Sequence, residues 1–364
     1  MFLTSINILN YKNYSNAAVS FTNKFNLING LNGSGKTNLI DAIYYLCLCK
    51  SYFTRSDADV MKHDENYFRL DGNFISGDQK DLITAKFTVP KKEFFRNNLV
   101  YERLSDHIGS FPVVMIAPDD IAIINDGSEE RRRFLDTAIA QVNHIYLQRL
   151  ILYNKILQQR NIVLKNYGLT GKLDRTLINV LNNQLAVESE FIYHERKKYL
   201  AEFSIAFSEL YHLISGEQEA GVIEYQSQLD EHDHLHLLLN SLKEDTHAQR
   251  TTTGMHKDDL RLLVNGFPVR EIGSQGQIKS FLIAMKLTQY SRMLALTGKR
   301  SILLLDDIFE KLDKKRLEVL FGILNDDAYA QIFMTDADEH RSLEFFEEHI
   351  EEFGHFKIDN NLIL

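Results

Sequence analysis

The sequence predicts an α/β protein in which mixed β-sheets surround one central helix and a helical lobe is inserted into the chain. Three observations support this prediction. A glycine-rich loop at residues 30–37 is preceded by a strand pattern and followed by a helix pattern. Strand-like runs continue to about residue 117. Residues 129–214 then show helical periodicity with very few Pro or Gly, and strand patterns return after residue 220.

Composition sets broad limits. The 364 residues are enough for one large domain with an insertion, or for two domains. No apolar run approaches the roughly 18 residues of a membrane span, and the N-terminus lacks the features of a signal peptide. Cys47 and Cys49 are better explained as buried small hydrophobes than as a metal or redox site. We therefore expect a cytoplasmic protein in a reducing setting, with no membrane partner.

The first strands lead into the glycine-rich loop. Residues 2–9, 17–21 and 25–29 are expected to be strands, and Lys12 lies in the turn between the first two. Lys12 either bends back toward a nucleotide or is a solvated turn lysine. Further strands are expected at 67–74, 82–89, 99–104 and 112–117. This much β-structure directly after such a loop is unlike a small kinase, in which strands alternate with helices.

The loop itself fits G-x-x-x-x-G-K-[ST], the phosphate loop of ATP- and GTP-binding proteins. Its glycines let backbone N–H groups face phosphate oxygens, its lysine supplies a mobile charge, and its threonine offers a hydroxyl to Mg²⁺. The following helix would place the phosphates at its N-terminus. The candidate phosphate-binding residues are Gly30, Leu31, Asn32, Gly33, Ser34, Gly35, Lys36, Thr37 and Asn38.

Two motifs near the C-terminus narrow the class of protein. Ser274, Gln275, Gly276 and Gln277 open a long helix over 278–296, in a pattern that predicts a capping box and an anion site at the helix end. Residues 301–305 then form a buried strand pattern that ends in Asp306 and Asp307. Asp306 is suited to bind Mg²⁺, and Asp307 to orient or deprotonate the attacking water; the plainer explanation is an acidic strand end.

The order of these motifs is that of ABC-type ATPases. In that arrangement the Ser-Gln-Gly-Gln helix end contacts the γ-phosphate held by a second subunit, so that ATP joins two chains and hydrolysis releases them. We expect an ATPase lobe at 1–118 plus 250–364 and an inserted helical lobe at 119–249. The helical lobe includes an antiparallel helix pair that turns near Gly168 and Gly171.

Charge is distributed unevenly along the chain. The net charge is −9, yet residues 131–200 contain twelve Lys/Arg and five Asp/Glu, which leaves this stretch at +7. A local basic face can follow nucleic-acid phosphates whatever the total charge. The cluster Arg131, Arg132 and Arg133 is the candidate DNA contact, although basic helix faces are often simply solvated. His256 is a further candidate ligand or base, with a structural role as the alternative.

At this point the chain resembles the RecF family of SMC-type ATPases over essentially its whole length. The residues that carry the resemblance are 8–14, 30–43, 118–120, 131–136, 159–161, 183–186, 254–260, 274–277 and 303–313. The resemblance implies a cytoplasmic, nucleoid-associated DNA-binding protein that forms an ATP-dependent homodimer. It would act in replication and in recombinational gap repair with RecR and RecO, and would help RecA to load.

The resemblance also implies roles for single residues. Lys36 and Thr37 would hold phosphate and Mg²⁺. Ser274 and Gly276 would contact the nucleotide of the second subunit, and Asp306 would be the acidic residue associated with the metal. Asp119 or Asp120 would stand where the metal-loop glutamine is usual. Asp307 replaces the Glu of most ABC enzymes and is one methylene shorter, so we expect slow, DNA-stimulated hydrolysis below the ~1–100 s⁻¹ of kinases.

Two other functions fit the phosphate loop. A nucleotide-binding subunit of an ABC transporter would need a membrane partner. A small-molecule P-loop kinase would turn over ATP as a monomer, and the Ser-Gln-Gly-Gln helix end would then have no role.

Overall fold

The computed structural model describes residues 1–217, 219–310, 312–359 and 362–363. The chain forms two compact units. Unit 1 comprises Met1–Asp120, Leu213–Glu217 and Ser274–Leu364, and unit 2 comprises Ile121–His212 and Gln218–Gly273. Residues 250–273, which we expected in the ATPase lobe, belong to unit 2 because their strand Asp259–Val264 (β10) pairs with Gly221–Gln226 (β9).

One sheet of unit 1 is antiparallel, with the strand order β2-β1-β4-β5-β6-β7. The strands are Phe2–Tyr11 (β1), Tyr14–Ser20 (β2), Tyr67–Ser76 (β4), Gln79–Thr88 (β5), Lys91–Arg96 (β6) and Leu99–Val100 (β7). The charged strand β6 was not expected. The strand expected over 99–104 was wrong beyond Val100, because β7 pairs with β6 at two residues only and Leu104–Asp106 is a 3₁₀ turn.

The second sheet has the order β15-β14-β3-β13-β12-β8. Its strands are Phe25–Asn29 (β3), Val113–Ile116 (β8), Ile302–Leu305 (β12), Gln331–Asp336 (β13), Phe353–Asp359 (β14) and Leu362–Ile363 (β15). All neighbouring pairs are parallel except β14 with β15. The carboxyl ends of β3, β13 and β12 therefore meet at one edge, which is where open parallel sheets bind ligands.

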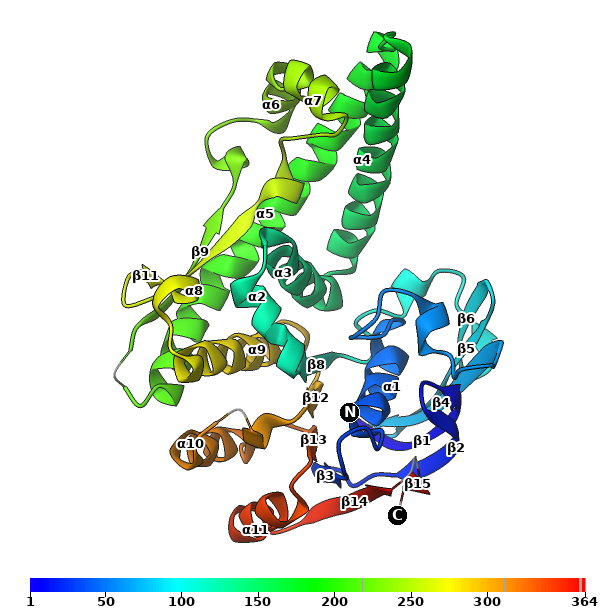
Figure 1. Ribbon diagram of the computed structural model, residues 1–364, viewed down its shortest axis with the longest axis vertical. Helices are drawn as coiled ribbons and strands as arrows, with labels where there is room; N and C mark the ends of the chain where they lie inside the picture. The colour runs from blue at the N-terminus through cyan, green and yellow to red at the C-terminus, as the bar shows by residue number, and fades with distance from the viewer. Residues whose placement is uncertain (218, 311, 360–361, 364) are drawn as a thin grey trace. The chain divides into compact units, whose positions relative to one another are not determined.

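Helix α1, Lys36–Leu48, lies between the two sheets (Figure 1). It is buried on almost every side, and Ile40, Ile43 and Leu46 join a core cluster to which both sheets contribute. Apart from Asp41, α1 is apolar beyond its first turn, and such a helix belongs in an interior position. Helices Lys314–Leu324 (α10) and Glu339–His349 (α11) pack on β3 through Phe321 and Phe346. Helix Gln275–Thr297 (α9) packs along β8.

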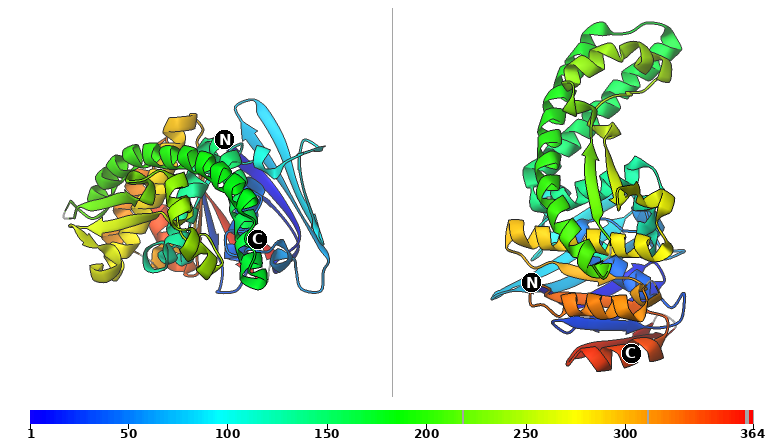
Figure 2. Two further views of the ribbon diagram at one scale, coloured as in Figure 1. Left: turned by 90° about the horizontal axis from the view of Figure 1, so that it is seen from above. Right: turned by 90° about the vertical axis from the view of Figure 1, so that its left-hand side faces the viewer.

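Unit 2 is mainly helical. Its long helices His144–Thr170 (α4) and Arg175–Ile214 (α5) form the expected antiparallel pair, joined by polar contacts such as Arg149 to Glu188 (2.9 Å) (Figure 2). The turn follows Gly171, whose φ of 69° closes α4. The other elements are Ala122–Asn125 (α2), Ser128–Val142 (α3), His234–Asn240 (α6), Leu242–Ala248 (α7), Phe267–Pro268 (β11) and Val269–Ile272 (α8). Asn265 and Gly266 form the turn of a hairpin in which β10 pairs with the two-residue strand β11.

Short 3₁₀ helices occupy Asp57–Val60, Pro118–Ile121, Gln228–Asp230, Met255–Lys257 and Ile308–Glu310. Among the helices of the described residues, none is both long and apolar enough to cross a membrane.

Candidate nucleotide site

The phosphate loop follows β3 and ends where α1 begins. Gly33 has a φ of 82° and Gly35 a φ of 115°, a region that L side chains rarely adopt. A Cβ on Gly35 would lie 2.9 Å from Nδ2 of Asn13 and from the hydroxyl of Tyr14, which donates to the Gly35 carbonyl oxygen (3.0 Å). The loop therefore needs glycine at this position for its backbone conformation and for space.

Three features of the loop suit an anion. The ammonium of Lys36 donates to the carbonyl oxygens of Gly30 (2.7 Å) and Leu31 (3.2 Å), so it is held inside the curve of the loop. The N-cap residue of α1 is Gly35, which has no side chain to cap the helix N-terminus. Within the described part of the chain, the Ser34 hydroxyl is shielded from solvent and has no hydrogen-bond partner. Backbone donors, a lysine and an orphaned hydroxyl fit the phosphates of a nucleotide.

Two further candidate nucleotide-binding residues, Asn38 and Lys12, make contacts within the protein. The amide of Asn38 donates to Oδ1 of Asn13 (2.8 Å) and ties α1 to the β1–β2 turn. The ammonium of Lys12 lies 2.7 Å from Oδ2 of Asp41 and 5.0 Å from the centre of the Phe53 ring. The structure thus places Lys12 on a buried carboxylate of α1, and its expected nucleotide contact stays a prediction.

Asp306 lies beside the start of α1, across 269 residues of sequence. The Thr37 hydroxyl donates to the Asp306 carboxylate, 3.1 Å from Oδ1 and 3.0 Å from Oδ2. The Thr335 hydroxyl on β13 donates to the same Oδ1 (2.6 Å) and accepts from the Asp307 N–H (3.0 Å). The backbone of Asp307 is left-handed, with a φ of 49°. The structure thus brings together Lys36, Thr37 and both aspartates.

Burial sets the protonation behaviour of Asp306. The side chain is almost fully buried, and this desolvation raises the pKa of its carboxyl to about 6. The hydrogen bond from Thr335 lowers that pKa, and the charge of Asp307 raises it. A cation bound next to this buried carboxylate would stabilise its ionised form.

A threonine hydroxyl in contact with a carboxylate is a donor set of hard oxygens, which suits Mg²⁺. Thr37 and Asp306 are the residues that would hold the ion, and Mg²⁺ bound there would offset charge on the β- and γ-phosphates. Among the described residues there is no cluster of three or more His, Cys, Asp or Glu side chains that could hold a metal. Mg²⁺ at a phosphate site does not need one, because it is bound by one or two protein groups plus phosphates and waters.

Asp119 and Asp120 differ sharply in their surroundings. Asp119 is exposed, whereas Asp120 is buried and its carboxylate accepts from Nζ of Lys286 (2.7 Å), from the Tyr52 hydroxyl and from the backbone N–H of Ala117 (2.7 Å). Asp120 thus ties the end of β8 to α9.

The helix end of α9 has the expected capping box. The Gln277 N–H donates to the Ser274 hydroxyl (3.2 Å), and the Gln277 side chain accepts from the Ser274 N–H (2.7 Å). Ser274 and Gln275 are exposed. A Cβ on Gly276 would lie 2.2 Å from Nη1 of Arg316, so the glycine leaves room for a guanidinium beside the helix end. An exposed, capped helix end with a cation next to it can receive an anion.

The three arginines proposed for DNA are engaged inside unit 2. Arg131 forms a two-point pair with Asp259 (2.6 and 3.0 Å). Arg132 donates to Ser128 (2.6 Å) and to the carbonyl oxygen of Asp258 (2.7 Å), and Arg133 pairs with Glu130 (2.5 Å). Through these contacts Arg131 and Arg132 join α3 to the segment at Asp258 and Asp259, whereas Arg133 pairs within α3. The contact of all three arginines with DNA stays a prediction.

His256 takes the structural role that we left open. Its Nδ1 meets the Tyr153 hydroxyl (2.7 Å) and its Nε2 meets the Thr251 carbonyl oxygen (3.2 Å). Burial lowers the pKa of His256 to about 4, so the ring is neutral at physiological pH.

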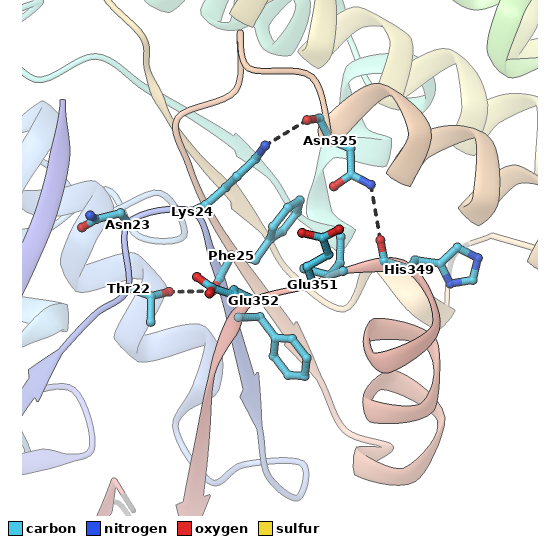
Figure 3. A pocket seen from close by; sticks show the side chains of 10 residues that line it. Thr22, Asn23, Lys24, Phe25, Asn325, His349, Glu351 and Glu352 are labelled. Carbon is cyan, nitrogen blue, oxygen red and sulfur yellow. Dashed lines mark hydrogen bonds between the residues drawn. The ribbon is translucent and has the colours of Figure 1, made fainter.

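A cavity of about 1080 Å³ lies at the start of β3, at the opposite end of this strand from the phosphate loop. It is lined by residues such as Lys24, Phe25, Asn325, His349 and Glu351 (Figure 3). Phe25 begins β3, whereas the phosphate loop follows its last residue, Asn29. This cavity is at the amino edge of the parallel strands and is distinct from the nucleotide site.

Sequence reasoning missed three polar residues: Thr335 at the aspartates, and the Tyr52 and Lys286 partners of Asp120. The only sequence signal for Thr335 is a polar residue directly after the apolar residues 332–334, and the strand order that places it beside Asp306 has no local signal. The pairing of Tyr52 with Lys286 spans 234 residues and has no local signal.

The fold and the site define an ABC-type ATPase head of the kind found in SMC proteins. The SMC head bound to the C-winged helix domain of ScpA superposes with a TM-score of 0.57 at 13% identity, over 100% of this chain and 96% of that one, which shows the fold alone. Residues 2–87 match the family described as the RecF/RecN/SMC N terminal domain.

The chain belongs to the RecF family. It is 39% identical over 363 residues to the DNA replication and repair protein RecF of Cytophaga hutchinsonii, covering 100% of this chain and 96% of that protein. It is 37% identical to the protein of that name from Bacteroides thetaiotaomicron, covering 100% and 98%. A structure of the recombination mediator protein RecF-ATP in the RecFOR pathway superposes with a TM-score of 0.89 at 28% identity, over 100% of this chain and 97% of that one.

Proposed function

We propose that this protein is an ATP-dependent DNA-binding switch that acts in DNA replication and recombinational gap repair. Two copies bind two ATP molecules between them, each supplying its phosphate loop to one nucleotide and its capped α9 end to the other. RecR- and RecO-type mediators are its partners, and its output is the loading of the RecA-type strand-exchange protein. This proposal draws on the relatives' roles in replication, repair and the RecFOR pathway.

The observation that carries the proposal is the meeting of Thr37 with Asp306 beside Lys36, combined with the exposed capping box at Ser274. The first suits a nucleotide and Mg²⁺, and the second is an exposed, capped helix end that can receive an anion. Asp307 offers a short carboxylate for water. We therefore infer slow, DNA-stimulated ATP hydrolysis that limits how long the dimer lasts.

Sedimentation velocity with and without ATP and Mg²⁺ tests the proposal. The wild-type protein is expected to double in mass when both are added. Lys36→Met is expected to stay a monomer because it loses the phosphate contact. Ser274→Arg is expected to bind ATP yet stay a monomer, because the bulky cation blocks the approach of the second subunit. Ser291→Arg, an exposed change on the same helix, is the matched control and should dimerise.

The competing functions give different results. A P-loop kinase would keep its activity in Ser274→Arg and would show no ATP-driven change in mass. A transporter subunit would co-fractionate with membranes. A wild-type protein that binds ATP and stays monomeric at concentrations well above its nucleotide affinity contradicts the proposed switch.

For DNA, we propose that exposed basic residues of α4 and α5 supplement the engaged arginine cluster. Lys155, Lys165, Lys172, Arg175 and Lys198 are exposed on these helices or the turn between them. Contacts to phosphates make binding sequence-independent and strongly dependent on salt. Changing Lys165, Lys172 and Arg175 to Glu is expected to lower DNA affinity and flatten its salt dependence more than Arg133→Glu does. Equal salt slopes in both variants would argue against this surface.

A further inference from the structure

The order of the strands places β13 between the two elements that carry the nucleotide chemistry. On one side β13 pairs with β3, which leads into the phosphate loop, and Thr335 is opposite Ile28. On the other side it pairs with β12, which ends at Leu305 opposite Met334, immediately before Asp306. A short polar side chain at Thr335 can therefore reach the first residues beyond β12.

Thr335 is fully buried, and its single hydroxyl serves both aspartates. It donates to Oδ1 of Asp306 over 2.6 Å and accepts from the backbone N–H of Asp307 over 3.0 Å. A buried threonine can satisfy its hydroxyl locally, as Thr288 does by donating to the Ala284 carbonyl oxygen one helical turn back (2.7 Å). The hydroxyl of Thr335 instead reaches the two residues that follow the neighbouring strand β12.

Each of the two hydrogen bonds controls a different degree of freedom. The bond to Oδ1 limits rotation of the Asp306 carboxylate, whose oxygens also receive the Thr37 hydroxyl. The bond from the Asp307 N–H holds a residue whose φ of 49° is unusual for a side chain other than glycine. Such a conformation persists when its surroundings fix it.

We propose that Thr335 is a positioning residue for ATP hydrolysis: it aims the Asp306 carboxylate at Thr37 and fixes the turn that presents Asp307. Without its hydroxyl, the carboxylate rotates more freely and the Asp307 side chain is no longer held in one direction. This inference rests on the proposed function, because it takes Asp306 and Asp307 to act on Mg²⁺-ATP.

The test compares Thr335→Val, which keeps the shape and removes the hydroxyl, with Thr335→Ser, which keeps the hydroxyl. Thr288→Val is the matched control, since it removes another buried threonine hydroxyl of unit 1 that lies in α9. Two quantities are measured for each protein. The first is affinity for a fluorescent ATP analogue in EDTA and across a Mg²⁺ titration. The second is steady-state hydrolysis across an ATP titration, which separates kcat from KM.

A hydrogen bond to a charged group contributes enough to shift an equilibrium by about tenfold or more. Thr335→Val is expected to need about tenfold more Mg²⁺ for half-maximal tightening and to lose about tenfold or more in kcat, with little change of nucleotide affinity in EDTA. Thr335→Ser is expected to recover most of both losses, and Thr288→Val to match the wild type.

The proposal is overturned if a folded Thr335→Val protein keeps the wild-type Mg²⁺ midpoint and kcat, or if Thr335→Ser is impaired as strongly as Thr335→Val. Should Thr335→Val fail to fold, Thr335→Ala is the second hydroxyl-free variant, and wild-type Mg²⁺ dependence in it has the same meaning. These results differ from failure of the proposed function, in which the wild-type protein itself shows no ATP-driven dimer.

Discussion

Replacing Asp306 by Asn is expected to stabilise the nucleotide-free protein at neutral pH. Asp306 is 3% exposed, and burial raises the pKa of its carboxyl to about 6 from an ordinary value of 3.8. At pH 7.5 the folded protein therefore holds an ionised carboxylate in surroundings that disfavour its charge. The substitution removes that charge and keeps the side chain's size and planar shape.

The magnitude follows from the shift. Roughly two pKa units at about 1.36 kcal/mol each correspond to an upper limit of about 3 kcal/mol, and we expect a gain of about 1–3 kcal/mol. The hydrogen bonds survive, because an Asn oxygen can accept from Thr335 and Thr37 and the amide can donate to the Thr37 oxygen. For a unit of roughly 200 residues this is a rise in Tm of about 2–4 °C per kcal/mol.

The pH dependence of the folding stability predicts the direction of this change independently. A carboxyl with a raised pKa binds more protons in the folded than in the unfolded protein between about pH 4 and 6. Its contribution to stability is therefore complete below about pH 4 and is lost as the pH rises through about 6. The wild-type protein is expected to lose this contribution as the pH rises, whereas Asp306→Asn has no carboxyl at this position to ionise. The stability gap between the two proteins therefore widens with rising pH.

Thermal and urea unfolding in EDTA, followed by circular dichroism from pH 4.5 to 8, measures this gap. Asp78→Asn, at an exposed turn, is the control for removing a carboxylate elsewhere in unit 1. A lower Tm for Asp306→Asn at pH 7.5, or a gap that does not change with pH, would refute the reasoning.

Three further predictions concern other parts of the structure. Gly35→Ala is expected to abolish nucleotide binding in a fluorescence titration and to destabilise unit 1 by about 1–3 kcal/mol, because its φ of 115° and the nearby Tyr14 hydroxyl leave no room for a Cβ. Arg196→Met is expected to cost about 3–5 kcal/mol in urea unfolding, because it removes the 1% exposed guanidinium that pairs with the buried carboxylate of Asp258 and the partly exposed carboxylate of Asp136. Burial lowers the pKa of His107 to about 4, so its stabilising contribution is present above about pH 6.5 and is lost as the pH falls through about 4; His107→Gln should flatten that part of the unfolding curve.

Each of these has a result that would contradict it. Gly35→Ala with wild-type nucleotide affinity would show that the loop adopts another backbone path. An Arg196→Met protein as stable as the wild type would mean that its carboxylate partners are hydrated or protonated. An acid-unfolding curve for His107→Gln that overlays the wild type would assign the acid sensitivity to other groups.

Local pattern determined much of the fold and most of the nucleotide-site residues. The phosphate loop, the capping box at Ser274 and the aspartates after a buried strand each carry their chemistry within a few adjacent residues. The antiparallel helix pair likewise followed from 3.6-residue periodicity and the turn at Gly171. Short strands at the sheet edge were predicted less well, since β7 has two residues and β6 has a charged sequence.

Tertiary structure decided which residues surround those motifs. Thr335 meets Asp306 because β13 lies between β3 and β12, an order that no local pattern specifies. The arginines of the basic cluster were expected at DNA, yet folding brings carboxylates and backbone carbonyls to them from distant segments, as Asp259 shows for Arg131. Sequence periodicity reports which side chains are apolar and which backbone can bend. It does not report which polar groups meet after the chain has folded, because those pairings depend on strand order and on contacts between residues hundreds of positions apart.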